Sequence, residues 1–166
     1  MLTIANQSTL FQDRYQALIM PVPVSGIFRH RLLLRFQSLY PEQYAQYKQI
    51  CERSELALGE ILVLDVQQDL IGMGVGRAVS KPKFIVMMAV TTVSESSPHL
   101  SAIQGCFQAL EPLLMRWGRY DGIRRVALLG SDDLIIPTDL SFDGAILPMV
   151  EKYLQPISRL NVVLYR

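Results

Sequence analysis

Net charge, cysteine and long hydrophobic runs are all scarce in this sequence. The 16 Lys and Arg residues nearly balance the 15 Asp and Glu residues, which leaves a formal net charge of +1. This balance gives no overall electrostatic attraction to nucleic acid or to an anionic membrane. The longest apolar runs, such as residues 84–90, are too short to cross a bilayer. We therefore expect no membrane association, and we do not expect nucleic acid as a partner.

Cysteine occurs only at Cys51 and Cys106, each within a helical pattern. We interpret both as free buried thiols, which fit a reducing cytosol. The first residues, MLTIANQST, contain no basic segment followed by an apolar stretch, so no signal peptide is expected. These observations predict a cytoplasmic protein.

Hydrophobic residues make up half of the 166 residues, and charged residues make up 19%. A chain of this length and composition can bury a sizeable core, and disorder is not expected. We find no internal repeat, linker or low-complexity tract. We therefore predict a single domain over residues 1–166.

Segments with strand and helix patterns alternate along much of the chain. Strands are expected at residues 2–5, 16–22, 60–66, 84–91, 125–129 and 160–165. Helices are expected from an N-cap at Ser25 to near Tyr40, from Pro41 to near Glu55, and over residues 100–117 and 142–154. This alternation predicts an α/β protein, a three-layer α/β/α sandwich with a mixed central sheet. Ligands of such folds usually bind beside the carboxyl ends of the strands, here residues 23–31, the loop after Thr91 and residues 130–139.

Two stretches carry a further signal, QALIMPVPVSG and RLLLRFQSLYPEQYAQYKQICERSELALGEILVL. In order and spacing they resemble the macrodomain family, with its strand end, its helix start and its Pro-Glu helix hinge, here Pro41-Glu42. The similarity extends over nearly the whole chain. It is nearest to the bacterial branch that includes ADP-ribosyl glycohydrolases of toxin–antitoxin systems. The resemblance implies a macrodomain fold and a cleft that in the family holds ADP-ribose.

The departures from that family fall on positions that contact its ligand. Thr9 stands where the family has an adenine-binding aspartate, and Met20 and Pro23 replace the two asparagines of the strand end. The Gly-Lys-Gly segment near the distal ribose and phosphates becomes Arg-His-Arg at residues 29–31. Thr91 stands where this branch places a catalytic lysine.

The late loop that wraps the diphosphate in the family is altered as well. Glycines in such loops let backbone N–H groups approach phosphate, whereas residues 130–138 are GSDDLIIPT, with one glycine. The side chains of Ile135 and Pro137 block that approach, and Asp132 and Asp133 repel a diphosphate. We predict a degenerate site in a pseudoenzyme. The alternative is a binder or hydrolase of ADP-ribose, or of another phosphorylated ligand, that uses a rearranged cleft.

Ten residues make up the candidate cleft: Pro23, Ser25, Gly26, Arg29, His30, Arg31, Thr91, Ser131, Asp132 and Asp133. Three interpretations stand for the basic side chains among them. They form an anion site at the helix start beside Ser25 and Gly26, they pair with Asp132 and Asp133 across the cleft, or they are a solvated face without a role.

The pairing interpretation predicts a closed cleft. Prolines stiffen the strand exit at residues 20–24, and Gly26 lets the chain turn toward the helix. One of the two arginines, Arg29 or Arg31, then forms a bidentate pair with one of the two aspartates. The adjacent residues 135–136, both Ile, fill the apolar part of the groove.

The remaining motifs point to no cofactor. The stretch GMGVGR at residues 72–77 is GxGxG without a following helix, so we predict a hairpin turn and not a phosphate loop. His30 and His99 are far apart, and neither has a neighbour with ligand spacing, so no metal is expected. As partner we expect another protein at the former ligand cleft, with a nucleotide-like ligand as the alternative.

Overall fold

The computed structural model describes residues 1–66, 81–94 and 96–166. In that part of the chain, one sheet has the strand order β1-β6-β5-β2-β4-β3. The strands are β1 (Leu2–Ala5), β2 (Ala17–Pro23), β3 (Ile61–Asp65), β4 (Phe84–Thr91), β5 (Arg125–Leu129) and β6 (Asn161–Tyr165). Neighbouring strands are parallel except β3, which runs antiparallel to β4. The predicted mixed sheet is confirmed, and the hairpin predicted at residues 72–77 lies outside the described residues.

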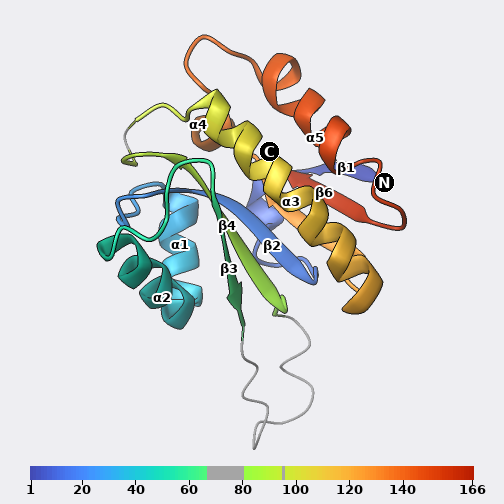
Figure 1. The fold of residues 1–166 in the computed structure, drawn as a ribbon, viewed down its shortest axis with the longest axis horizontal. Helices are drawn as coiled ribbons and strands as arrows, with labels where there is room; N and C mark the ends of the chain where they lie inside the picture. The colour runs from blue at the N-terminus through green and yellow to red at the C-terminus, as the bar shows by residue number, and fades with distance from the viewer. Residues whose placement is uncertain (67–80, 95) are drawn as a thin grey trace, which may run out of the picture.

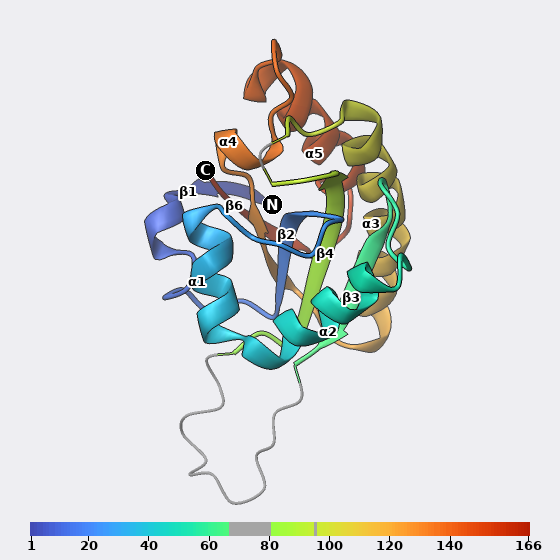
Figure 2. The ribbon, with the colours of Figure 1, turned by 90° about the vertical axis from the view of Figure 1, so that its left-hand side faces the viewer.

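Helices cover both faces of this sheet (Figures 1 and 2). They are η1 (Gln7–Thr9), α1 (Arg31–Leu39), α2 (Pro41–Glu52), α3 (Leu100–Tyr120), α4 (Asp132–Ile135), η3 (Phe142–Ile146) and α5 (Leu147–Tyr153). Helices α1 and α2 lie on one face, and α3 and α5 lie on the other. The three-layer α/β/α arrangement is therefore confirmed. Among the described residues, no helix combines the length and the apolar character that crossing a membrane requires.

Alternate residues of each central strand supply the two halves of the core. On β2, Ala17 and Ile19 pack in the cluster that contains α3 and α5, whereas Leu18 and Met20 pack in the cluster that contains α1 and α2. Because both faces are covered, a central strand is apolar at nearly every position, as β4 is. This explains why the sequence pattern locates these strands well.

Helix α3 lies close to the sheet at two contacts. A Cβ added to Gly105 would lie 3.0 Å from the carbonyl oxygen of Gly59, so the two backbones meet without side chains between them. Nearer the end of the helix, Trp117 stacks on Phe84 of β4 with 4.4 Å between ring centroids. Both cysteines are free thiols, as predicted, although Cys51 is only half-buried. Burial raises the pKa of the Cys106 thiol to about 12, so this group stays neutral.

The start of α1 differs from the prediction. Its N-cap is His30, not Ser25, and the helix begins at Arg31. The Oγ of Ser25 instead accepts a hydrogen bond of 3.4 Å from the N–H of Ile27. Gly26, with a φ of +79°, turns the chain in the left-handed region that favours glycine. The strand exit is therefore longer than expected, and the helix starts later.

Four further elements differ from expectation. Helices η1 and α4 were not predicted, because three or four residues are too few to show a helical period. The helix expected over residues 142–154 begins as a π-helical turn, η3, before α5. Strand β2 includes Pro23, where its register against β4 shifts.

Candidate functional site

The carboxyl ends of β2, β4 and β5 meet where the sequence predicts the cleft, and helix α2 fixes the exit of β2 there. The buried Tyr47 hydroxyl donates a short hydrogen bond to the carbonyl oxygen of Pro23. Tyr44 donates to the carbonyl of Gly26 at 3.0 Å, and the N–H of Val24 donates to the carbonyl of Thr91 at 2.9 Å. The strand exit is thus held from the helix on one side and from β4 on the other.

His30 links the start of α1 to the loop after β5. Its Nδ1 accepts a hydrogen bond of 3.1 Å from the backbone N–H of Leu32. In the neutral ring the hydrogen therefore lies on Nε2, which donates to Oδ2 of Asp133 at 2.7 Å. The His30 side chain is 13% exposed and that of Asp133 is 65% exposed, so the pair sits at the rim of the cleft.

Ser131 forms a hydrogen bond with the second oxygen of the same carboxylate. Its Oγ donates to Oδ1 of Asp133 at 2.5 Å, and Ser131 is buried. Burial alone raises the pKa of Asp133, but the hydrogen bonds from Ser131 and His30 and the His30 charge outweigh it and leave the pKa below the usual value of 3.8. Ser131, Asp133 and His30 do not form a nucleophilic triad, because the serine donates to the carboxylate and no base accepts its proton.

Asp132 has a different partner from the one predicted. It pairs with Arg166, with 3.0 Å between Nε and Oδ1, and the same guanidinium lies 4.3 Å from the centroid of the Phe142 ring. In the described part of the chain the two aspartates therefore pair with Arg166 and His30. The predicted pairing with Arg29 or Arg31 is wrong, although a basic side chain does bridge the cleft as expected.

Thr91 is buried at the end of β4 and is already hydrogen-bonded. Its Oγ1 donates to the carbonyl oxygen of Val93 at 2.8 Å, which stabilises the turn after the strand. This hydroxyl is therefore engaged within the protein. Among the described residues, no three His, Cys, Asp or Glu side chains come together to hold a metal ion.

In the part of the chain that the structure describes, a small cavity lies between the strand ends. The cavity is lined by Pro21, Val22, Pro23, Leu33, Val90, Thr91, Ser94, Ser96, Asp133 and Leu134. Its volume is about 10 Å³, which is the room that a single water molecule needs. The apolar side chain that lines it from α4 is Leu134, whereas Ile135 and Ile136 pack on the opposite face of the sheet. The prediction that those two isoleucines fill the groove is therefore wrong.

A larger hollow lies beside the start of α1. It is lined by Asn6, Gln7, Ser8, Arg31, Leu32 and Arg35, with a volume of about 540 Å³. Thr9 does not line this hollow, and its Oγ1 donates to Asp13 at 2.9 Å. Asp13 also accepts from the Tyr165 hydroxyl at 2.7 Å, so this carboxylate is hydrogen-bonded within the protein.

No family model matches the sequence, and no curated protein matches it. Solved structures are similar over the full length. The macrodomain of Thermus aquaticus DarG has a TM-score of 0.78 at 18% identity, covering 100% of this chain and 98% of that chain. The macrodomain of Mycobacterium tuberculosis DarG has a TM-score of 0.75 at 21% identity, covering 100% and 98%.

A third structure, Thermosipho africanus DarTG in complex with ADP-ribose, has a TM-score of 0.73 at 15% identity. It is matched over 99% of this chain and 41% of that chain. At such identities the likeness concerns the fold and not the residues of a site. The expectation from the sequence motifs is met at that level: this chain has the macrodomain fold.

Proposed function

We propose that this protein is a non-catalytic interaction module, a pseudoenzyme whose ADP-ribose cleft is closed by its own side chains. The observation that supports this most is the cavity of about 10 Å³ at the strand ends. A nucleotide-sized ligand needs a site of roughly 300 Å³ or more. Asp133 and Leu134 line that cavity, and His30 pairs with Asp133.

The electrostatics support the same proposal. Asp133 keeps its negative charge down to a lower pH than usual, and Asp132 lies beside it. Neither residue offers a hydrogen-bond donor to a diphosphate at neutral pH. Ser131 and Thr91, two hydroxyl groups at the strand ends, already donate to Asp133 and to Val93.

The closed surface offers a contact site for another protein. Ile27, in the loop before α1, is 53% exposed, and Val93, in the loop after β4, is 43% exposed. Both loops border the former cleft. Protein contact surfaces commonly combine exposed apolar side chains with polar groups at the rim.

Titration calorimetry with ADP-ribose and with NAD tests the proposal, because a closed cleft predicts no measurable heat of binding. Thermosipho africanus DarTG, solved with ADP-ribose bound, is the positive control. We also expect no release of ADP-ribose from modified protein or DNA. A low-micromolar dissociation constant for ADP-ribose would contradict the proposal.

A phosphorylated nucleotide-like ligand is the second candidate, and the hollow beside α1 favours it. Arg31 and Arg35 line that space, and both side chains are exposed. If the second candidate holds, a nucleotide will bind and Arg31→Ala will abolish binding. Binding that survives Arg31→Ala and Arg35→Ala would exclude this hollow as the site.

A further inference from the structure

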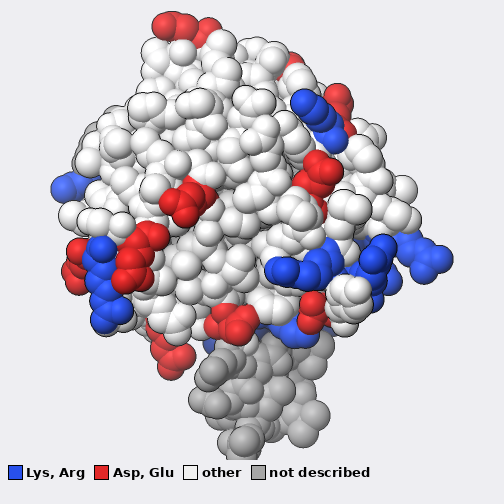
Figure 3. All heavy atoms as spheres, in the orientation of Figure 1, with Lys and Arg blue, Asp and Glu red and all other residues white. Residues whose placement is uncertain are grey.

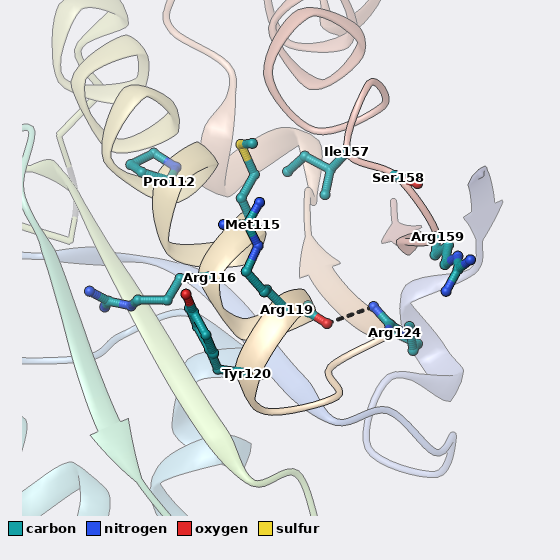
Figure 4. Close-up of a pocket in the computed structure, with 10 residues that line it drawn as sticks. Pro112, Met115, Arg116, Arg119, Tyr120, Arg124, Ile157, Ser158 and Arg159 are labelled. Carbon is teal, nitrogen blue, oxygen red and sulfur yellow. Dashed lines mark hydrogen bonds between the residues drawn. The ribbon is translucent and has the colours of Figure 1, made fainter.

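A groove lies at the opposite end of the strands from the closed cleft. It runs between the last turns of α3 and the loop that leads into β6, and its volume is about 600 Å³. The lining residues are Pro112, Met115, Arg116, Gly118, Arg119, Tyr120, Arg124, Ile157, Ser158 and Arg159 (Figure 4). Arg124 and Arg159 precede β5 and β6, so this groove lies at the amino ends of the strands. We call it the arginine groove.

The charge of the arginine groove is of one sign. Four of its ten lining residues are arginines, and none of the ten is Asp or Glu. The nearby Asp121 pairs at 3.7 Å with Lys83, which lies outside the groove. In the described part of the chain, no carboxylate pairs with Arg116, Arg119 or Arg159. In the view of Figure 3, basic side chains gather toward the lower right, on the side where α3 ends.

Apolar and aromatic side chains share the groove with these cations. Met115 is 53% exposed and Tyr120 is 74% exposed, and Ile157 is half-buried. Figure 4 shows Met115 of the helix and Ile157 of the loop directed toward each other, with Arg124 and Arg159 together at one end. Tyr, Met and Arg are the residues enriched at protein–protein contacts, where Lys, Asp and Glu are depleted.

The backbone conformation of Arg159 also indicates a role for its side chain. Its φ is +61°, in the left-handed region where a residue other than Gly or Asn is unfavourable. The location of Arg119 in the last turn of α3 is explained by the helix dipole, which favours a cation there. That explanation does not extend to Arg159, which is in a loop. An arginine in a strained loop position beside three others is best explained by a role for its side chain.

We propose that the arginine groove binds an acidic segment of a partner protein, with carboxylates on the arginines and an apolar side chain between Met115 and Ile157. From Pro112 to Tyr120 the helix rises about 12 Å, which an extended peptide spans in about four residues. An alternation of acidic and apolar residues fits this length. The inference goes beyond the proposed function, since the groove is remote from the former cleft and does not depend on its closure.

Two observations favour an acidic peptide over nucleic acid. The net charge of the whole chain is +1, so no wider field supports a long phosphate backbone. The apolar side chains of Met115 and Ile157 offer no hydrogen bond to phosphate or sugar. Arginine binds carboxylates in bidentate geometry, so the same side chains serve a peptide well.

The test is fluorescence polarisation with a labelled peptide in which Glu and Leu alternate, against the full chain. We expect saturable binding to the wild-type protein. Each of Arg119→Ala and Arg159→Gly is expected to weaken it about tenfold, the effect of losing one charged hydrogen-bonded contact. Gly at position 159 keeps the positive φ, so this variant is expected to fold at least as well as the wild type. Met115→Asp should weaken binding as well.

Controls distinguish specific binding of the acidic peptide in the groove from unspecific binding of polyanions to the protein. Arg53→Ala, on the end of α2, removes an exposed arginine elsewhere and should leave peptide binding unchanged. A matched peptide with Lys in place of Glu should not bind. The proposal is overturned if the acidic peptide does not bind, or if its binding survives both arginine variants. It is also overturned if a single-stranded oligonucleotide binds more tightly than the peptide and loses its binding with the same variants.

Discussion

Nε2 of His30 lies 2.7 Å from Oδ2 of Asp133, joining two segments that are 103 residues apart in the sequence. The same imidazole caps α1 through Nδ1, and the same carboxylate accepts from Ser131. One histidine thus caps a helix and links that helix to the loop after β5. Both nitrogens of the ring are hydrogen-bonded within the protein.

Replacing His30 by alanine should destabilise the protein by about 1–2 kcal/mol. Loss of the N-cap accounts for about 1 kcal/mol, and loss of the partly exposed pair with Asp133 accounts for less. Urea unfolding measures the change. His99→Ala is the matched control, because His99 precedes α3 without a side-chain cap bond, and its effect should stay below about 0.5 kcal/mol. Equal losses for the two variants would contradict the double role of His30.

Asp133 should make stability depend on pH in the acid range. Its pKa in the folded protein is below 3.8, so the unfolded chain takes up the proton first as the pH falls. The stabilisation is complete above the unfolded pKa and is lost as the pH drops through the folded value. Since the carboxylate is mostly exposed, the contribution is at most about 0.5 kcal/mol. Urea unfolding at successive pH values should show a smaller acid loss for Asp133→Asn than for the wild type.

Tyr47→Phe should cost about 1–2 kcal/mol of unfolding free energy, because it leaves the buried carbonyl of Pro23 without its donor. Burial raises the pKa of the Tyr47 hydroxyl far above its usual value, so the donor is present at every practical pH. Tyr44→Phe is the comparison, since its bond to Gly26 is only partly buried. The Tyr44 variant should lose less. A larger loss at Tyr44 than at Tyr47 would show that the strand exit is held mainly at Gly26.

Gly26→Ala should destabilise more than Gly122→Ala. Both glycines have positive φ, +79° and +66°, so both variants lose about 1 kcal/mol from backbone strain. A Cβ at Gly26 would also lie 3.1 Å from Cβ of Cys51, whereas nothing lies within 4 Å at Gly122. The difference in Tm between the two variants measures the cost of the contact between the new Cβ and Cys51. Equal shifts in Tm would mean that Cys51 moves aside without cost.

The strands were the part of the fold that the sequence predicted best. Residues 84–91 and 125–129 match β4 and β5, since strands inside a covered sheet leave an apolar run with clear ends. Residues 2–5 match the edge strand β1. Short helices left no such pattern, and α4 was missed. Because this helix was not predicted, the directions of its side chains could not be predicted either. Ile135 was expected in the cleft, where Leu134 lies instead.

The sequence predicted where the residues of the candidate site lie better than it predicted which side chains pair with each other. His30, Ser131 and Asp133 do come together, as their placement in loops at the strand ends indicates. Their pairing could not be inferred, because the helix start moved from Ser25 to His30 and this changed which side chain faces the loop. Arg166 was not considered, since nothing local connects it to Asp132. The single-domain and cytoplasmic expectations stay predictions.

The stack of Trp117 on Phe84 has a practical consequence for all of these measurements. Trp117 is the only tryptophan of the chain, and it is 4% exposed. The tryptophan fluorescence of the protein therefore comes from one place, the packing interface between α3 and β4. A red shift on exposure to water reports the separation of helix and sheet without any attached dye. The same indole lies one turn from Tyr120, so the protein carries its own optical reporter next to the arginine groove.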